Sequence, residues 1–430
     1  MTAPPPAIKA VHLTYAEARD RVRAAVRPLG SEPVPLDQAL GRALLEPLVA
    51  PHALPPFDNT SMDGYAVRSE DTTSASARRS VALTVVEVLP AGHVASRGLR
   101  AGEAMRIMTG AAIPPGADSV VAFEDCERVG EGAAERVRVA RPVAHRENVR
   151  AAGADLAAGA TALGAGRELS PHDVALAAAL GAGTVVVGRR PRVAIVSTGD
   201  ELLAVDAPLR PGAIRDSNVP LLRALVAEAG GTVVVATHAS DDPRAVAAAL
   251  RGALEQSDVT LSIGGVSAGD FDPVKQAIGE LEGVELWRVA MKPGRPQAFG
   301  VPEGRLFFGL PGNPASVACV FEALVRPALR ALAGYAALGR PRIAVRAAER
   351  IESRAGRTDF VRVTLEWRGG SWIATPAGPQ ISGHLTPQSR AHALLVVPEE
   401  AERLETGDEA EAWVLRLPEG TYPGDRKGRT

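Results

Sequence analysis

Strand-like and helix-like patterns of apolar residues alternate along residues 191–334. Short runs rich in valine, isoleucine and leucine predict buried strands, and longer segments with helical spacing predict the helices between them. The predicted strands cover residues 192–197, 232–237, 258–263 and 305–310, and the predicted helices cover 219–229, 243–255, 273–281 and 314–332. This alternation predicts a doubly wound, mostly parallel α/β sheet with helices on both faces.

Two flanking regions have the pattern of β structure without long helices. Before the α/β region, short runs broken by glycine and proline lie at residues 81–89, 103–108, 119–123 and 136–139. After it, similar runs lie at residues 343–347, 360–367, 371–375, 393–397 and 410–415. Each set predicts a small β domain.

Three further helices are predicted in the first 180 residues. One covers residues 15–27, where Thr14 and Glu17 have the spacing of a capping box. The others cover residues 36–45 and 171–180, the latter with Ser170 as its cap.

Composition narrows the possible classes of function. With 430 residues the chain predicts several domains and a large core. The formal net charge of -2 gives no general attraction to nucleic acid or to anionic membranes, so we expect neither as a partner. No apolar run reaches the roughly 18 residues of a spanning helix, and the proline-rich start lacks a signal peptide's apolar core, which predicts a cytoplasmic protein. Cys126 and Cys319 are too few for a disulfide framework or a thiolate metal site.

The most informative motif follows the strand predicted at residues 258–263. Gly264 and Gly265 expose backbone N–H groups at the carboxyl end of this strand, where open α/β sheets bind ligands. Turn geometry explains the glycines but not the polar residues that follow closely, which are Ser267, Asp270, Asp272 and Lys275. The motif therefore predicts a site for a phosphate and a divalent cation.

Two other predicted strands also end in carboxylates. Asp200 and Glu201 follow the strand at 192–197, and Asp241 follows the strand at 232–237. Stabilising a turn or opening a helix would explain these residues about as well as binding would. Because these strand ends share one sheet edge, Glu201, Asp241 and Asp272 can face the same cleft.

A compact basic group lies between residues 288 and 295. If this segment is extended, its period of two places Arg288 and Lys292 on one face, and the Pro-Gly turn brings Arg295 near them. Such a group suits phosphate and other oxyanions. Pro311, Gly312 and Asn313 join a strand to a helix N-terminus, where anion binding and structural capping are equally good explanations.

Several motifs, in order along nearly the whole chain, resemble the molybdopterin molybdenumtransferase family, whose eukaryotic counterpart is the gephyrin E domain. The motifs are Asp-Asn-Thr-Ser-Met-Asp-Gly-Tyr-Ala at 58–66, Ile-Met-Thr-Gly-Ala at 107–111, Ser-Thr-Gly-Asp-Glu-Leu at 197–202, Gly-Gly-Val-Ser-Ala-Gly at 264–269, Lys-Pro-Gly-Arg at 292–295 and Leu-Pro-Gly-Asn-Pro at 310–314. The resemblance implies four domains. These are a linker domain at 8–50 and 148–189, an inserted β domain at 51–147, an α/β molybdopterin-binding domain at 190–334 and a barrel-like C-terminal β domain at 335–417.

The resemblance also implies a reaction. Molybdate and adenylylated molybdopterin react with release of AMP, and molybdenum is left on the dithiolene sulfurs of the pterin. Because the substrate supplies these soft ligands, a chain with two cysteines can handle the metal. The resemblance further implies an active site at the subunit interface of a homodimer, with the adenylyltransferase of the same pathway as a partner.

The resemblance assigns roles to individual residues. Glu201, Asp241 and Asp272 match acidic residues expected to bind Mg²⁺ and act in catalysis together with Lys292. The positions expected to bind substrate are Asp200, Gly264, Gly265, Ser267, Asp270, Arg288, Arg295, Pro311, Gly312, Asn313, Arg357 and Ser382, with Asp63, Thr109 and Asp155 reaching the cleft from the second subunit.

Three alternatives stay open at this point. A molybdopterin adenylyltransferase uses a similar α/β domain, and a gephyrin-like scaffold would bind peptides without turnover. An inactive paralogue is the third, because Ala154 stands where family members often carry glutamate. The sequence does not distinguish molybdate from tungstate as the oxyanion.

Overall fold

The computed structural model describes residues 10–130, 135–266 and 273–418. The chain forms two compact units. Unit 1 contains residues 1–45, 165–170 and 186–430, and unit 2 contains residues 46–164 and 171–185. The finer division into four domains stays a prediction.

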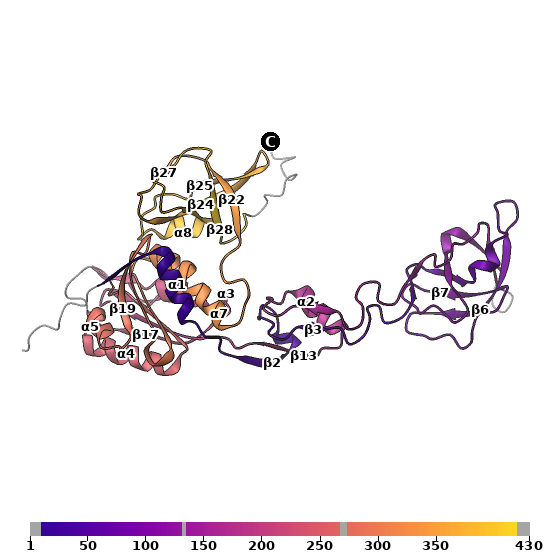
Figure 1. Ribbon diagram of the computed structural model, residues 1–430, viewed down its shortest axis with the longest axis horizontal. Coiled ribbons are helices and arrows are strands. Elements are labelled where there is room, and N and C mark those ends of the chain that lie inside the picture. Colours follow the sequence, from indigo (N-terminus) through magenta and orange to yellow (C-terminus); the bar gives the residue numbers. More distant parts are fainter. Residues whose placement is uncertain (1–9, 131–134, 267–272, 419–430) are drawn as a thin grey trace, which may run out of the picture. The chain divides into compact units, whose positions relative to one another are not determined.

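Unit 1 contains a doubly wound α/β sheet, as predicted from the alternating pattern (Figure 1). Its strands are β1 (Val11–Thr14), β14 (Arg192–Thr198), β17 (Thr232–Ala239), β18 (Val259–Ile263), β19 (Val284–Lys292), β20 (Pro296–Gly300) and β21 (Leu306–Leu310). They lie in the order β17-β14-β18-β21-β20-β19, with β1 beside β19. All run parallel except β20, which is antiparallel to both of its neighbours.

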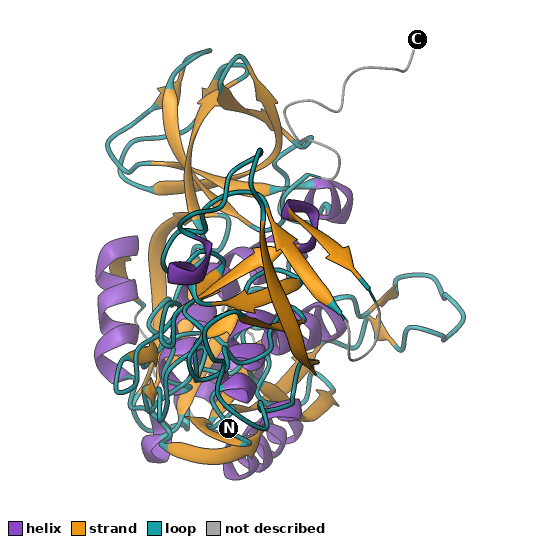
Figure 2. Ribbon diagram, turned by 90° about the vertical axis from the view of Figure 1, so that its right-hand side faces the viewer, coloured by secondary structure: helices purple, strands orange, loops and turns teal. Residues whose placement is uncertain are grey.

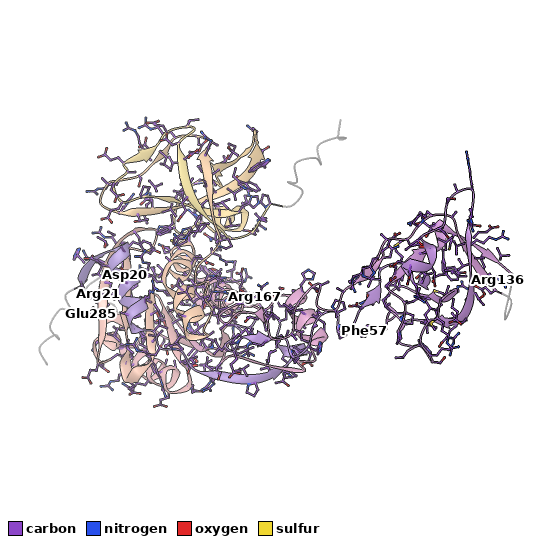
Figure 3. All side chains as sticks on the ribbon, turned by 45° about the vertical axis from the view of Figure 1, so that its right-hand side comes forward. Asp20, Arg21, Phe57, Arg136, Arg167 and Glu285 are labelled. Atoms are coloured by element: carbon purple, nitrogen blue, oxygen red, sulfur yellow. The ribbon has the colours of Figure 1, made fainter. Side chains whose placement is uncertain are left out.

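Helices cover both faces of this sheet. They are α1 (Tyr15–Ala25), α3 (Asn218–Glu228), α4 (Pro243–Gln256), α5 (Pro273–Gly279), α6 (Pro314–Val320) and α7 (Arg326–Leu332), with a π-helical segment at Phe321–Val325 between the last two. Val193 and Ile195 of β14 pack in one core with α1, α3, α6 and α7, whereas Ala194 and Val196 pack in a second core with α4 and α5. Burial on both faces explains why these strands are continuous apolar runs. Arg21 of α1 and Glu285 of β19 form an ion pair of 3.1 Å (Figure 3).

The C-terminal part of unit 1 is a small closed sheet. Its strands are β22 (Arg342–Ala347), β24 (Thr358–Arg368), β25 (Ser371–Pro376), β26 (Ala393–Val397) and β28 (Glu409–Val414), with α8 (Leu385–Arg390) before β26. They pair in the order β24-β25-β22-β28-β26, and β26 returns to β24, which closes the barrel-like sheet (Figure 2). Strand β24 also pairs with β19, so the two sheets of unit 1 share one hydrogen-bonded ladder.

Shorter elements complete unit 1. They are β2 (Ser31–Pro35), the 3₁₀ turns Leu36–Gln38 and Pro302–Gly304, β15 (Leu202–Leu203), β16 (Ile214–Arg215), β23 (Ile351–Glu352) and β27 (Arg403–Leu404). Strand β13 (Thr184–Gly188) spans the boundary between the units.

Unit 2 is built on a six-stranded sheet. Strands β5 (Gly64–Val67), β6 (Val81–Leu89), β7 (Glu103–Ile107), β8 (Ser119–Ala122), β9 (Cys126–Val129) and β10 (Arg136–Val139) lie in the order β8-β5-β7-β6-β10-β9. The smaller elements are β3 (Leu48–Val49), β4 (Asn59–Thr60), β11 (Val149–Arg150), β12 (Thr161–Leu163), α2 (Pro171–Ala179) and the 3₁₀ turns Ser69–Thr72 and Phe123–Asp125.

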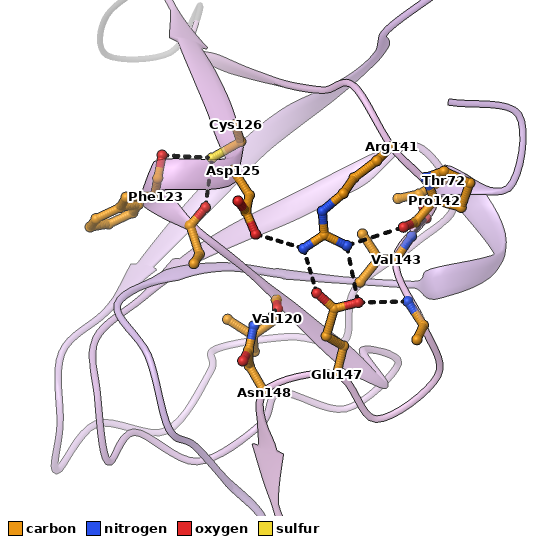
Figure 4. Close-up of polar contacts among 12 residues, drawn as sticks. Thr72, Val120, Phe123, Asp125, Cys126, Arg141, Pro142, Val143, Glu147 and Asn148 are labelled. Atoms are coloured by element: carbon orange, nitrogen blue, oxygen red, sulfur yellow. Dashed lines mark hydrogen bonds and ion pairs between the residues drawn. The ribbon is translucent and has the colours of Figure 1, made fainter. Parts of the chain in front are cut away.

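A polar network ties together the loops around this six-stranded sheet (Figure 4). The Arg141 Nη2 atom lies 2.5 Å from Glu147 and 2.6 Å from Asp125, while its Nη1 atom donates to the second Glu147 oxygen at 3.2 Å. Glu147 also accepts the backbone N–H of Ala144 at 2.8 Å. These hydrogen bonds raise the pKa of Arg141 and lower that of Glu147, so both charges are stabilised in the fold.

The predicted helix at residues 36–45 is wrong. A short 3₁₀ turn over Leu36–Gln38 is followed by Gly41 with φ of 71°, which ends any helical course. The chain then makes bridges from Ala43 to Glu168 and from Leu44 to Val187. Tertiary pairing therefore overrides the local helical pattern. The helix at residues 15–27 is confirmed as α1, with the Thr14–Glu17 capping box present.

In the described part of the chain, the helices are too short or too polar to span a membrane. Of the two cysteines, Cys319 is buried and Cys126 is partly buried. Burial raises the pKa of Cys126 to about 11, consistent with the predicted packing role.

Candidate active site

The loops that carry the predicted site residues leave one edge of the α/β sheet. Strands β17, β14, β18 and β21 run parallel, and β19 runs in the same direction because β20 is antiparallel to both β21 and β19. Their carboxyl ends therefore meet along one edge. Along this edge, carboxylates follow β17 and β14, glycines follow β18, and basic residues lie at the end of β19.

The glycine turn after β18 requires backbone freedom. Gly264 and Gly265 have φ values of 91° and 68°, which favour glycine, and the Gly264 N–H donates to the Leu310 carbonyl at 3.0 Å. A Cβ atom on Gly264 would lie 3.0 Å from the Thr198 hydroxyl oxygen, so β14 and β18 approach closely here. Ser267, Asp270 and Asp272 lie outside the described residues, and their roles stay predictions.

The carboxylates after β14 and β17 lie beside each other. The Asp200 N–H donates to Asp241 Oδ2, and the Asp241 N–H donates to Asp200 Oδ1, both at 3.3 Å. The Glu201 carboxylate lies directly beside Gly199. A Cβ atom added to Gly199 would be only 2.5 Å from Glu201 Oε2. The structure thus brings Asp200 and Asp241 together. Within the described ranges, no group of three acidic, histidine or cysteine residues is close enough to hold a metal ion, and Asp272 falls in a gap between those ranges.

A cavity of about 780 Å³ lies within unit 1 at the basic end of this edge. Its lining includes Arg288, Lys292, Arg295, Pro311, Asn313, Arg357 and Ser382, all of which were predicted from the sequence to bind substrate or act in catalysis. Gly312 is not part of the lining, but its carbonyl accepts from the Asn218 side chain at 2.7 Å, which fixes the loop between β21 and α6.

The basic group has the geometry predicted for an extended segment. Arg288 and Lys292 are exposed on β19, while Val289 and Met291 between them are buried. Arg295 follows the turn and is also exposed. Among the described residues, the side chains of these three cations make no hydrogen bond or ion pair. Their charge is therefore available to a ligand.

Two residues from loops of the C-terminal part of unit 1 complete the predicted part of the cavity. Arg357 pairs with the buried Asp359, with Nε 2.8 Å from Oδ1 and Nη2 3.1 Å from Oδ2. Ser382 accepts a hydrogen bond from the Asn313 amide at 3.0 Å. The cavity thus joins the α/β sheet to the C-terminal sheet.

Sequence reasoning missed several lining residues. His12 of β1 lies in register with Arg288, and Arg354 lies in the loop before Arg357. Glu17 and Glu399 are the acidic residues of the lining. Hydrogen bonds from the Thr14 backbone and side chain lower the pKa of Glu17. The capping box was visible in the sequence, but its position at the cavity depends on the pairing of β1 with β19.

Unit 2 holds the other three predicted residues. Asp63 Oδ1 accepts the backbone N–H and the hydroxyl of Thr109, both at 2.7 Å, which lowers the pKa of Asp63. Asp155 is exposed, and its backbone N–H donates to the Leu54 carbonyl at 3.0 Å. The structure pairs Asp63 with Thr109.

The α/β sheet, its glycine turn and the unpaired cations define the class of protein. It is a multidomain α/β protein with a cavity lined by several cations at the carboxyl edge of a doubly wound sheet.

Comparisons with known proteins identify the family. Residues 13–181 match the MoeA N-terminal region (domain I and II), residues 194–331 match a probable molybdopterin binding domain, and residues 344–415 match the MoeA C-terminal region (domain IV). The chain is 39% identical over 388 residues to molybdopterin molybdenumtransferase 2 of Mycobacterium tuberculosis, covering 89% of this chain and 94% of that protein. It is 36% identical over 394 residues to the molybdopterin molybdenumtransferase of Nostoc sp., covering 90% and 89%.

A solved structure is similar over most of the chain. The molybdopterin biosynthesis moeA protein of Pyrococcus horikoshii OT3 has a TM-score of 0.80 at 30% identity, covering 94% of this chain and 100% of that chain. The chain therefore belongs to the molybdopterin molybdenumtransferase (MoeA) family of molybdenum-cofactor biosynthesis.

Proposed function

We propose that this enzyme inserts molybdenum from molybdate into adenylylated molybdopterin and releases AMP. The observation that carries the proposal is the cavity of about 780 Å³, whose Arg288, Lys292 and Arg295 side chains have no partner among the described residues. Cations grouped in one cavity without a protein counter-ion favour a polyanionic ligand. We expect the reaction to take place in the cytoplasm.

The chemistry of the lining suits an oxyanion and a phosphate. Arginine can bind two oxygens at once through its planar guanidinium, and Lys292 adds a compact charge. Ser382 and Asn313 add neutral polar groups that can select geometry. Charge that develops on the reacting phosphate oxygens would be stabilised by these groups.

The acidic end of the same edge suits Mg²⁺. This ion prefers carboxylate oxygens, usually keeps several waters, and binds through one or two carboxylates together with substrate phosphates. Asp241 and Glu201 would hold it together with Asp272, and Asp200 supports Asp241 through their exchanged hydrogen bonds. When bound, Mg²⁺ would neutralise charge on the phosphoanhydride.

The stoichiometry balances with water. Cleavage of the phosphoanhydride consumes one water molecule and yields AMP and the phosphate of molybdopterin. Binding of molybdate to the two pterin thiols forms two Mo–S bonds and breaks one Mo–O bond. The released oxygen takes up both thiol protons and leaves as water. No oxidant or reductant is required.

The proposal includes a homodimer. Asp63, Thr109 and Asp155 would act at the active site of the second subunit, and the adenylyltransferase of the same pathway would supply the substrate. Sedimentation of the purified protein would test the dimer directly.

The deciding experiment measures AMP released from adenylylated molybdopterin by the purified protein, with Mg²⁺, with and without molybdate. We expect molybdate-dependent release together with a metallated pterin, and loss of release when Mg²⁺ is chelated. Tight binding of substrate without AMP release would contradict the proposal and indicate an inactive paralogue or scaffold. ATP-dependent adenylylation of molybdopterin would instead indicate an adenylyltransferase.

A further inference from the structure

Ser382 reaches the cavity on a loop that has no strand partner of its own. The loop covers residues 377–384, between β25 and α8. One side of it is held by the start of α6, where the Ala315 N–H donates to the Ser382 carbonyl at 3.0 Å. The Asn313 amide donates to the Ser382 hydroxyl oxygen, also at 3.0 Å. Since a serine hydroxyl has one donor as well as its lone pairs, the Ser382 O–H stays available for an anion.

The other side of this loop is held by a single buried arginine of β24. Arg362 is 2% exposed, and its guanidinium donates to the carbonyls of Pro379, Ile381 and His384, each at 3.2 Å. Its Nε atom donates to Gln380 Oε1, also at 3.2 Å. These acceptors lie on both sides of Ser382 in the sequence.

Gln380 and the backbone of Arg362 reinforce this arrangement. The Arg362 N–H donates to Gln380 Oε1 at 3.0 Å, and the Gln380 amide donates to the Arg362 carbonyl at 3.1 Å. The Ala377 N–H donates to the same carbonyl at 2.9 Å. Together these bonds fix both ends of the loop to one position of β24.

The partners of Arg362 are unusual for a buried charge. Within the described part of the chain, no carboxylate forms an ion pair with Arg362. Burial of a charge is costly, and here the cost is offset by neutral loop oxygens. An apolar residue would fill the space without that cost, so packing alone does not explain an arginine here.

We infer that Arg362 is a positioning residue, which sets the Ser382 hydroxyl for the oxyanion without contacting the oxyanion itself. This inference rests on the proposed function, because the oxyanion is the molybdate of that reaction. Lysine keeps the charge of Arg362 but not its planar fork of donors, so it cannot hold all four loop acceptors.

The test is a double-mutant cycle on the full-length enzyme, with KM for molybdate, kcat and the melting temperature measured for each variant. The variants are Arg362→Lys, Ser382→Ala and the two combined. We expect Arg362→Lys and Ser382→Ala each to raise KM about tenfold, as loss of one hydrogen bond to a charged ligand would, with kcat changed less than about twofold. If Arg362 acts through Ser382, the double variant will have the KM of Ser382→Ala alone. A KM raised about a hundredfold in the double variant, or an unchanged KM in Arg362→Lys, would overturn the inference.

Arg330→Lys is the matched structural control. Arg330 is 4% exposed and is bonded to Glu168 and to the Ala337 carbonyl, but it does not line the cavity. We expect this variant to lower the melting temperature without changing KM.

If Arg362→Lys does not fold, Gln380→Ala replaces it in the cycle, with faster amide hydrogen exchange over residues 377–384 as a second readout. Exchange that stays slow would count against the inference.

Measurements on the wild-type enzyme distinguish a failure of the proposed function from a failure of the role inferred for Arg362. If AMP release by the wild type does not depend on molybdate, the proposed function fails. If release depends on molybdate and the effects of the two substitutions multiply, only the role of Arg362 fails.

Discussion

The arginines around the six-stranded sheet of unit 2 and the cations of the cavity in unit 1 carry the same charge among different neighbours. Arg141 is bonded to Glu147 and Asp125, and Arg97 forms two bonds with Glu103. Arg288, Lys292 and Arg295 have no such partner among the described residues. A paired cation stabilises the fold locally, whereas an unpaired cation in a cavity stays available to a ligand. We therefore expect the neighbours of a basic residue, together with its place in the cavity, to separate a structural from a functional role here.

The largest effect is expected for Lys292→Ala. Removal of this unpaired charge should reduce molybdate-dependent AMP release about a hundredfold, which is about 3 kcal/mol of transition-state stabilisation. The melting temperature should change little, because no protein group loses a partner. Arg136→Ala is the control, since Arg136 is exposed on β10 of unit 2 and its side chain has no partner among the described residues (Figure 3). Equal loss of activity in both variants would contradict the distinction between the cations of the cavity and other exposed cations.

For Arg141→Ala we expect a loss of stability without a loss of activity. Loss of its three bonds to Glu147 and Asp125 should lower the free energy of unfolding by about 1–2 kcal/mol, with kcat and KM unchanged. Thermal unfolding together with hydrogen exchange in unit 2 would measure this. Arg138→Ala is the matched control, because Arg138 makes a single exposed pair of 3.6 Å with Glu127. A change below about 0.5 kcal/mol is expected there.

A smaller effect is expected for Arg354→Ala. Arg354 lines the cavity but is exposed, and it has no partner among the described residues. KM for molybdate should rise about threefold, since an exposed cation is strongly screened by solvent and salt. Arg350→Ala, which removes a pair with Glu352 and leaves the lining of this cavity intact, should not change KM. An unchanged KM in Arg354→Ala would show that lack of a partner alone does not make a cation functional.

The smallest expected effect is the pH dependence of the stability that Glu147 contributes. Arg141 lowers the pKa of Glu147 below its ordinary value of 4.5, so the stabilising contribution of the ionised carboxylate is present above that value. This contribution is lost as the pH falls through the lowered pKa of the folded state. The stability difference between the wild type and Glu147→Gln should therefore be constant near neutral pH and shrink below about pH 4.5. A difference that is independent of pH would mean that the network stabilises the fold without the charge of Glu147.

Much of the site could be predicted because parallel strands bring distant motifs to one sheet edge. The motifs after β14, β18 and β21 lie together for this reason, and the period of two on β19 placed Arg288 and Lys292 on one face. Arg357 and Ser382, which line the cavity from loops beside the C-terminal sheet, came from the family resemblance.

The pairing of charged side chains was not predicted from the sequence. Arg357 pairs with Asp359 two residues later and Arg141 with Glu147 six residues later, whereas Lys292 has no such pair among the described residues. The helix predicted at residues 36–45 was wrong because bridges to Glu168 and Val187 decide the course of that segment. The hydrogen bonds from Arg362 to the loop at residues 377–384 depend on how that loop folds back onto β24, which the sequence does not show.

The pairing of β1 with β19 has a consequence for synthesis on the ribosome. Val11 lies opposite Trp287, a residue made roughly 280 positions later. At about 5–20 residues per second, the first strand would wait roughly 14–55 s for its partner. Unit 2 lies inside that interval in the chain, so its own residues are complete before β19 emerges. We expect the nascent chain to fold from the inside outwards, with the N-terminal helix exposed to chaperones until the sheet of unit 1 can close around it.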